Sequence, residues 1–372
     1  MKTLFGLAAA AVLLAGAGDA RAQQKGDPMD VVVLADGTSV KCRIKSATHK
    51  EVTYTDEKGK AHTKKGSEIG LITFGDEPMA FPSAKNAVLA KLPEKAATKF
   101  EEALKEVEAK KAREWNKAPI LLHWGLFLAE RGDVTGALAM LKRIRTECGD
   151  SWWRPESWRS SIEVAKVKGV EAHKSVLEEM KSEPEPLGSE AELALADLAI
   201  SRGEHDEALT IFRKLGDNKS SPNSEAGRLG ILRTLKSLKR NSELDDYSKK
   251  LLDDPTSTPA LQQAAGAWIA GSQLEKAGKD KAKIRGALMA AAKAVAMGPP
   301  DRKEEAEDYV AALRVSAKGW AALAADAPKA EMKQEYKSRA SGYLMEIVRA
   351  YKGTPWAEAA QLELQTLGVQ EN

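Results

Sequence analysis

A repeated run of residues restricts the fold of this chain more than any other feature of its sequence. Residues 131–141 read Arg-Gly-Asp-x-x-x-Ala-Leu-x-Met-Leu, and residues 202–212 read Arg-Gly-Glu-x-x-x-Ala-Leu-x-Ile-Phe. Their glycines, Gly132 and Gly203, are 71 residues apart, which is twice about 35. Beyond residue 95 the apolar residues recur with the period of a helix, and no segment alternates like a strand. A period of this length in a helical sequence predicts stacked pairs of helices.

The two copies resemble the tetratricopeptide repeat (TPR) family, whose unit is two antiparallel helices in about 34 residues. Gly125 and Ala137 match the small positions where the paired helices of that family approach each other, as do Ala196 and Ala208 in the second copy. Further matches to the turn and aromatic positions of the family are Gly132, Trp158, Gly169, Gly203, Phe212 and Gly278. The resemblance implies an α-solenoid that ends in a capping helix.

Two positions depart from this pattern. Lys174 stands where the family has a small residue, and Asn241 marks the turn expected midway between Gly203 and Gly278. The resemblance extends over roughly Lys95 to Gly368, and the motif specifies a fold without specifying a ligand.

Residues 30–75 have the period of strands instead. Val40, Cys42 and Ile44 alternate with basic residues, as expected of a strand with one apolar and one solvated face. Strands are predicted over residues 31–34, 39–46, 51–55 and 67–74, joined by Asp-Gly and Lys-Gly turns. The pattern resembles small SH3-like or Sm-like barrels. The basic stripe of Lys41, Arg43 and Lys45 has two interpretations: a surface for a polyanion, or a solvated face or protected sheet edge.

The predicted fold class is therefore α+β and multidomain, with a small N-terminal antiparallel β barrel followed by an all-α TPR-like superhelix. The expected divisions are a signal peptide at 1–22, a linker at 23–29, the β module at 30–75, a junction at 76–94 and the solenoid at 95–372.

The N-terminus has the composition of a secretory signal. Lys2 precedes an uncharged stretch from Leu4 to Ala17, and Ala20-Arg21-Ala22 offers a small-x-small cleavage pattern. The alternative, a membrane anchor, needs about 20 apolar residues, and this stretch is shorter. We therefore expect a periplasmic or secreted protein with no transmembrane segment after cleavage. In an oxidising compartment, Cys42 and Cys148 are either buried thiols or a disulfide pair.

The sequence contains no motif that brings catalytic or metal-binding residues together. The five histidines are scattered, and no H-E-x-x-H, G-x-S-x-G or phosphate-binding glycine loop occurs. The 57 basic and 54 acidic residues nearly balance, which disfavours nucleic acid as a partner. We expect no cofactor and no enzymatic activity. The leading interpretation is an exported scaffold or adaptor for protein–protein interaction in the cell envelope. The alternatives are an envelope enzyme or enzyme subunit with dispersed catalytic carboxylates, and a structural component that self-associates.

Candidate binding residues follow from the TPR resemblance, which implies that the first helix of each pair lines a concave surface. The residues placed there are His123, Arg159, Lys166, Asp197 and Arg228. Arg159 and Lys166 share a face next to Trp153, and this basic groove with an aromatic edge would suit an acidic peptide or a C-terminal carboxylate. The adjacent Trp152 and Trp153 have two interpretations, as the core of an irregular connection or as anchors for a peptide or glycan.

Overall fold

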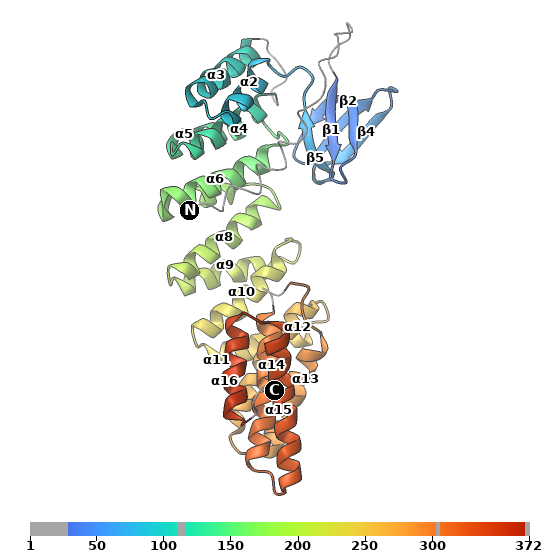
Figure 1. Ribbon diagram of the computed structural model, residues 1–372, viewed down its shortest axis with the longest axis vertical. Coiled ribbons are helices and arrows are strands. Elements are labelled where there is room, and N and C mark those ends of the chain that lie inside the picture. The colour runs from blue at the N-terminus through green and yellow to red at the C-terminus, as the bar shows by residue number, and fades with distance from the viewer. Residues whose placement is uncertain (1–28, 110–115, 303–305, 369–372) are drawn as a thin grey trace. The chain divides into compact units, whose positions relative to one another are not determined.

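The computed structural model describes residues 29–109, 116–302 and 306–368. Over these residues the chain forms one five-stranded sheet and fifteen α-helices, and it divides after Lys168 into two compact units. Figure 1 labels the strands and most of the helices and colours them from blue to red along the chain. Each unit is described by itself. The predicted signal peptide and all but the last residue of the predicted linker lie outside the described residues.

The first unit contains the β module. Its elements are β1 Asp30–Leu34, β2 Ser39–Ala47, β3 Glu51–Asp56, β4 Ala61–Lys65, the 3-10 helix η1 Gly66–Glu68 and β5 Ile69–Thr73. All pairs are antiparallel, in the order β4-β3-β2-β1-β5. The predicted barrel is therefore corrected to an open sheet whose edges are β4 and β5. β4 reads Ala-His-Thr-Lys-Lys and offers no large apolar side chain for closure onto β5.

The alternation predicted for β2 is confirmed. Cys42 and Ile44 are buried, while Lys41, Arg43 and Lys45 are exposed. The buried carboxylate of Asp30 accepts hydrogen bonds from the backbone N–H of Ile44, at 2.8 Å, and from that of Gly75, at 3.0 Å. The predicted last strand begins two residues late, because residues 66–68 form η1 instead.

The helices follow in sequence. The first unit holds α2 Ala80–Leu89, α3 Pro93–Ala109, α4 Lys117–Glu130, α5 Val134–Glu147 and α6 Arg154–Lys168. The second holds α7 Val170–Met180, α8 Leu187–Ser201, α9 His205–Asp217, α10 Ser224–Ser237, α11 Asn241–Asp253, α12 Pro259–Ala277, α13 Lys281–Ala296, α14 Glu307–Ala325, α15 Ala330–Ala350 and α16 Pro355–Thr366. Helix α2 thus forms within the predicted junction. In the part of the chain that the structure describes, no helix is both long and apolar enough to span a bilayer.

The turns inside the helix pairs share one geometry. Gly132 and Gly203 take left-handed conformations, with φ of 83° and 77°, as predicted for interhelix turns. In each turn the backbone N–H of the residue after the glycine donates to the carbonyl of the residue five positions before it. Asp133 donates to Leu128 and Glu204 donates to Ala199, both at 2.9 Å. This hydrogen bond defines a Schellman motif.

Two lysines adopt the same motif without the freedom of glycine. Lys91 and Lys239 both have a φ of 55°, and the amides after them bond to Ala87 and Leu235. Asn241, predicted to mark the turn, is instead the first residue of α11. Gly169 and Gly278 also have positive φ and lie between helices.

Small residues recur at fixed distances from these turns. The positions seven before and five after the left-handed residue are Ala84 and Ala96 for α2–α3, Gly125 and Ala137 for α4–α5, and Ala196 and Ala208 for α8–α9. All six are buried. A Cβ on Gly125 would lie 3.3 Å from the carbonyl oxygen of Ala137, which shows how closely α4 and α5 approach. These positions are consistent with the prediction that Gly125, Ala137, Ala196 and Ala208 let paired helices approach closely.

Candidate interaction site

The two tryptophans left open by the sequence connect the β module to the helices of the first unit. The Trp152 indole N–H donates to the Gly66 carbonyl at 3.2 Å, and its backbone N–H donates to that of Ala47 at 3.0 Å. Trp153 is 6% exposed, with its ring centroid 5.5 Å from that of Phe74. These contacts favour the core interpretation over an anchor for a ligand. Trp158 is also buried, with the Arg145 guanidinium 3.7 Å from its ring centroid.

His123 does not line an open groove. Its ring lies 5.5 Å from that of Phe81 on α2, a helix that the sequence had assigned to the junction. Burial, with a smaller effect from the charge of Lys85, lowers the pKa of His123 to about 4. A neutral, packed imidazole is better explained as part of the α2–α4 contact than as a binding group.

Arg159 and Lys166 lie seven residues apart on α6 and are both exposed. This spacing places them on one face of the helix, as predicted. The Lys166 ammonium is 2.6 Å from the Glu163 carboxylate, so its charge is already partly balanced.

Asp197 and Arg228 belong to the second unit, on α8 and α10. The Asp197 residue is exposed to solvent. Protein atoms around its carboxylate still remove part of its hydration and raise its pKa, and the charge of Arg233 opposes this rise. Arg228 is held in an ion pair with Asp254 at 2.6 Å, and both side chains are largely buried. Together with hydrogen bonds from Thr256, this pair lowers the pKa of Asp254. Arg228 is thus part of the structure of the α10–α11 pair.

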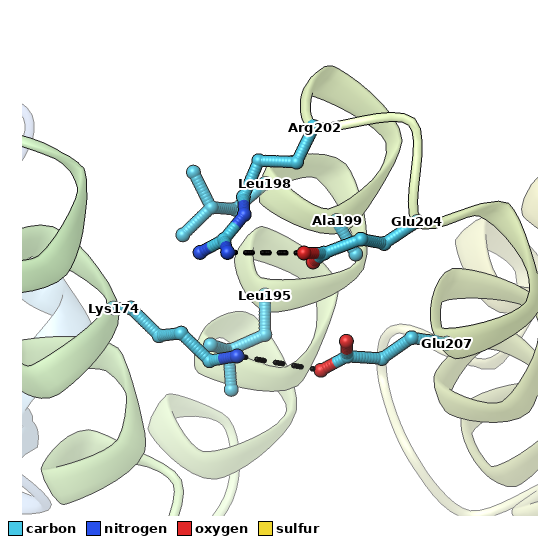
Figure 2. A pocket seen from close by; sticks show the side chains of 7 residues that line it. All are labelled: Lys174, Leu195, Leu198, Ala199, Arg202, Glu204 and Glu207. Atoms are coloured by element: carbon cyan, nitrogen blue, oxygen red, sulfur yellow. Dashed lines mark ion pairs between the residues drawn. The ribbon is translucent and has the colours of Figure 1, made fainter.

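A small gap between α7, α8 and α9 is closed by ion pairs (Figure 2). Lys174 of α7 reaches Glu207 of α9 at 3.5 Å, and Arg202 pairs with Glu204 at 3.0 Å. Leu195 and Leu198 of α8 lie between them, and the space enclosed is about 10 Å³, enough for one water. Lys174 stands where the TPR resemblance predicts a small residue, and its side chain links α7 to α9.

A larger hollow opens between α9, α10 and α11, which we call the α9–α11 hollow. Its volume is about 300 Å³, and its lining residues are Arg213, Ile231, Leu235, Glu243, Asp246, Tyr247 and Lys250. Ile231 and Leu235 form its floor and are 3% and 1% exposed. The half-buried Tyr247 lines it from α11. An apolar floor within a polar rim is the usual composition of a binding pocket, and this volume lies at the small end of the range.

Charged residues of both signs form the rim of the hollow. Arg213 of α9 bonds to Glu243 of α11 at 3.0 Å, and Arg240 bonds to the same carboxylate at 2.6 Å. Hydrogen bonds from Arg240 first, and then from Arg213, lower the pKa of Glu243. Lys250 is exposed and forms no ion pair with any residue that the structure describes.

The residues at the helix crossing explain why this pair stands open. Relative to Lys239, the positions seven before and five after are Leu232 and Leu244, where three other pairs have alanine or glycine. Both leucines are buried, and α10 and α11 pack less closely along their length than α8 and α9 do. Larger side chains at a crossing increase the distance between helix axes. Leucine at both crossing positions, in place of alanine or glycine, is the sequence signal for the hollow.

The thiols of Cys42 and Cys148 are both buried. Burial first, and the charge of Asp30 second, raise the pKa of the Cys42 thiol to about 11. The two residues are not joined in a disulfide, which favours buried thiols over the disulfide pair. Within residues 29–109, 116–302 and 306–368, no three His, Cys, Asp or Glu side chains are grouped to hold a metal ion.

No family model matches the chain, and no curated protein matches it. Among solved structures, a TPR protein from Parabacteroides merdae is 16% identical, with a TM-score of 0.35 over 77% of this chain and 96% of that one. The apo quorum sensor NprR from B. thuringiensis is 11% identical, with a TM-score of 0.32 over 78% and 70% of the two chains. A human IFIT1 dimer with m7Gppp-AAAA is 14% identical, with a TM-score of 0.29 over 78% and 68%. The helical-repeat architecture described above rests on the helix pairs of this chain and not on these resemblances.

Proposed function

We propose that this chain is an exported, non-enzymatic TPR-like scaffold that binds an extended peptide segment of a partner protein, with one apolar side chain of that segment in the α9–α11 hollow. The observation that carries the proposal is the floor of the hollow. Ile231 and Leu235 are almost fully buried by the surrounding helices, yet they line a 300 Å³ space that opens to solvent. An apolar side chain placed there would remove its own surface from water, which is favourable.

The rim supports a peptide as the occupant. Glu243 is held by Arg213 and Arg240, so its charge is balanced before any ligand arrives. Burial raises the pKa of the Tyr247 hydroxyl, and Arg228 opposes the rise. Tyr247 and the exposed Lys250 both line the hollow, and a hydroxyl and an ammonium can each donate to the carbonyl groups of a peptide backbone. Export to the periplasm or the outside of the cell rests on the sequence pattern of residues 1–22.

The experiment is a selection from a library of random peptides against the chain lacking residues 1–22, followed by affinity measurements. We expect the selected peptides to share one large apolar residue. Tyr247→Ala should weaken their binding about tenfold or more, because truncation of an aromatic contact costs more than about 1 kcal/mol at a buried site. Tyr247→Phe should weaken it less, because it removes only the hydrogen bond of the hydroxyl.

Two neighbouring lysines on α11 supply a matched control. Lys250 lines the hollow and Lys249 does not, although both are exposed. Lys250→Ala should weaken peptide binding and Lys249→Ala should leave it unchanged. Equal affinities for all four variants would place the binding site elsewhere, and failure to select any peptide would favour the self-associating component, which light scattering of the same preparation would reveal as an oligomer.

A further inference from the structure

We propose that the outer face of the β sheet binds an extended, acidic segment of a protein. The inference rests on the proposed function, because it adds a second contact with a protein partner, but it uses a different part of the chain. We call this surface the basic face, and its charged members are Lys41, Arg43 and Lys45 of β2 with Lys65 of β4. All four side chains are exposed.

The position of β2 removes one structural explanation for these charges, the protection of a sheet edge. Lysines often occupy edge strands, where they prevent association with other sheets. β2 is not an edge strand, because it pairs with β1 on one side and β3 on the other. Lys41 and Lys45 form no ion pair with any described residue, so their charges are available to a ligand.

The residues around the stripe keep the face basic. The register places Val31 opposite Lys41 and Thr55 opposite Arg43, so that β1 and β3 contribute uncharged side chains. Glu51 of β3 is the one acidic residue that alternates onto this face among the described strands, and it lies opposite Lys65. Val33 and Leu71 are paired across β1 and β5 and are half-buried, which adds an apolar margin on the other side of the stripe.

The spacing of the charges fits an extended peptide. Alternate residues of a strand lie about 6.6–6.8 Å apart on one side, which gives the separation of Lys41 and Arg43. A β-bulge between Ile44 and Ser46 interrupts this regular spacing at Lys45. Alternate side chains of an extended acidic segment have the same spacing, so successive carboxylates can meet successive basic groups.

Other polyanions match this face less well. Proteins that bind single-stranded nucleic acid combine basic residues with aromatic platforms for the bases, and the strand residues that alternate onto this face include no aromatic side chain. Membrane-surface binding uses large apolar or aromatic side chains that insert between lipids, whereas Val31, Val33 and Leu71 are only partly exposed. Charge complementarity without stacking or insertion points to an acidic peptide.

The test uses fluorescence anisotropy of a labelled, alternating Glu-Val peptide of about ten residues, with an alternating Lys-Val peptide as the charge control. The protein is the chain lacking residues 1–22. At about 50 mM salt we expect the double variant Lys41→Gln, Lys45→Gln to bind the acidic peptide about tenfold more weakly than the wild-type chain. Raising the salt concentration should weaken the wild-type interaction more than that of the variant.

Lys293→Gln with Lys318→Gln is the matched control, because it removes the same charge from exposed positions on α13 and α14. It should change the affinity less than twofold, since neither lysine belongs to the basic face. Equal losses in the two double variants would overturn the proposal, as would tighter binding to an oligothymidylate or to phosphatidylglycerol vesicles than to the acidic peptide.

The same variants separate this inference from the proposed function. Peptides selected through the α9–α11 hollow should bind the Lys41, Lys45 double variant with unchanged affinity. Acidic peptide should likewise bind the Tyr247→Ala variant as it binds the wild-type chain. Loss of one interaction without the other shows which of the two proposals fails.

Discussion

The helix pairs α8–α9 and α10–α11 have the same turn but different interiors. Both turn through a left-handed residue, Gly203 or Lys239, and both close the turn with the same backbone hydrogen bond. At the crossing, however, Ala196 and Ala208 are replaced by Leu232 and Leu244. The first pair packs closely, and the second leaves the α9–α11 hollow. The turn geometry and the separation of the helices are therefore encoded by different residues.

The largest effect is expected when the closely packed pair α8–α9 receives a leucine at its crossing, as the open pair α10–α11 has. Ala208→Leu should destabilise the second unit by about 1–3 kcal/mol, because Ala208 is fully buried and a leucine there overpacks the crossing with Ala196. Chemical denaturation followed by circular dichroism measures this change. Leu209→Met, a volume-conserving change at the next residue, should cost less than about 1.5 kcal/mol. Wild-type stability of Ala208→Leu would show that the crossing residues do not set the separation.

A smaller loss is expected at the turn of the closed pair. Gly203→Ala should destabilise by about 1–2 kcal/mol, because the left-handed conformation disfavours any Cβ although no atom lies within 4 Å of it. Gly286 in α13 is the matched control, since a Cβ there also meets open space but the backbone is helical. Gly286→Ala should stabilise by up to about 1 kcal/mol. A shift of the same sign in both melting temperatures would contradict the assignment of Gly203 to a strained turn.

The smallest effect has the opposite sign and belongs to the open pair. Lys239→Gly should stabilise the second unit by up to about 1 kcal/mol, because glycine adopts the φ of 55° without strain but loses more entropy on folding. Thermal unfolding is the appropriate measurement. A fall in the midpoint would mean that the lysine side chain makes a contact worth more than the strain that it imposes.

The sequence predicted those parts of the fold that depend on local residue types. Gly132 and Gly203 could be placed in turns because glycine favours left-handed conformations, and the alternation of β2 revealed its buried face. Lys239 could not be placed in this way, because nothing in a lysine indicates positive φ. β4 could not be predicted as a strand, because apolar and polar residues do not alternate in it.

The candidate site was less predictable because it depends on residues far apart in the chain. The sequence alone allows two interpretations of Trp152. Its hydrogen bond to Gly66, 86 residues earlier, favours the core interpretation. His123 was placed in a groove because the helix that covers it, α2, had been assigned to the junction. The hollow depends on Leu232 and Leu244 together, across the turn at Lys239, and neither leucine is unusual alone.

Hydrogen–deuterium exchange with a selected peptide tests the central claim most directly, namely that the open pair is the binding site and the closed pairs are not. With saturating peptide, we expect amides in α9, α10 and α11 to become protected, because a ligand in the hollow suppresses local opening of the helices that hold it. Amides of α2–α5, where small residues already close the crossings, should exchange as in the unliganded chain. Protection confined to α2–α5, with unchanged exchange over residues 205–253, would contradict the account.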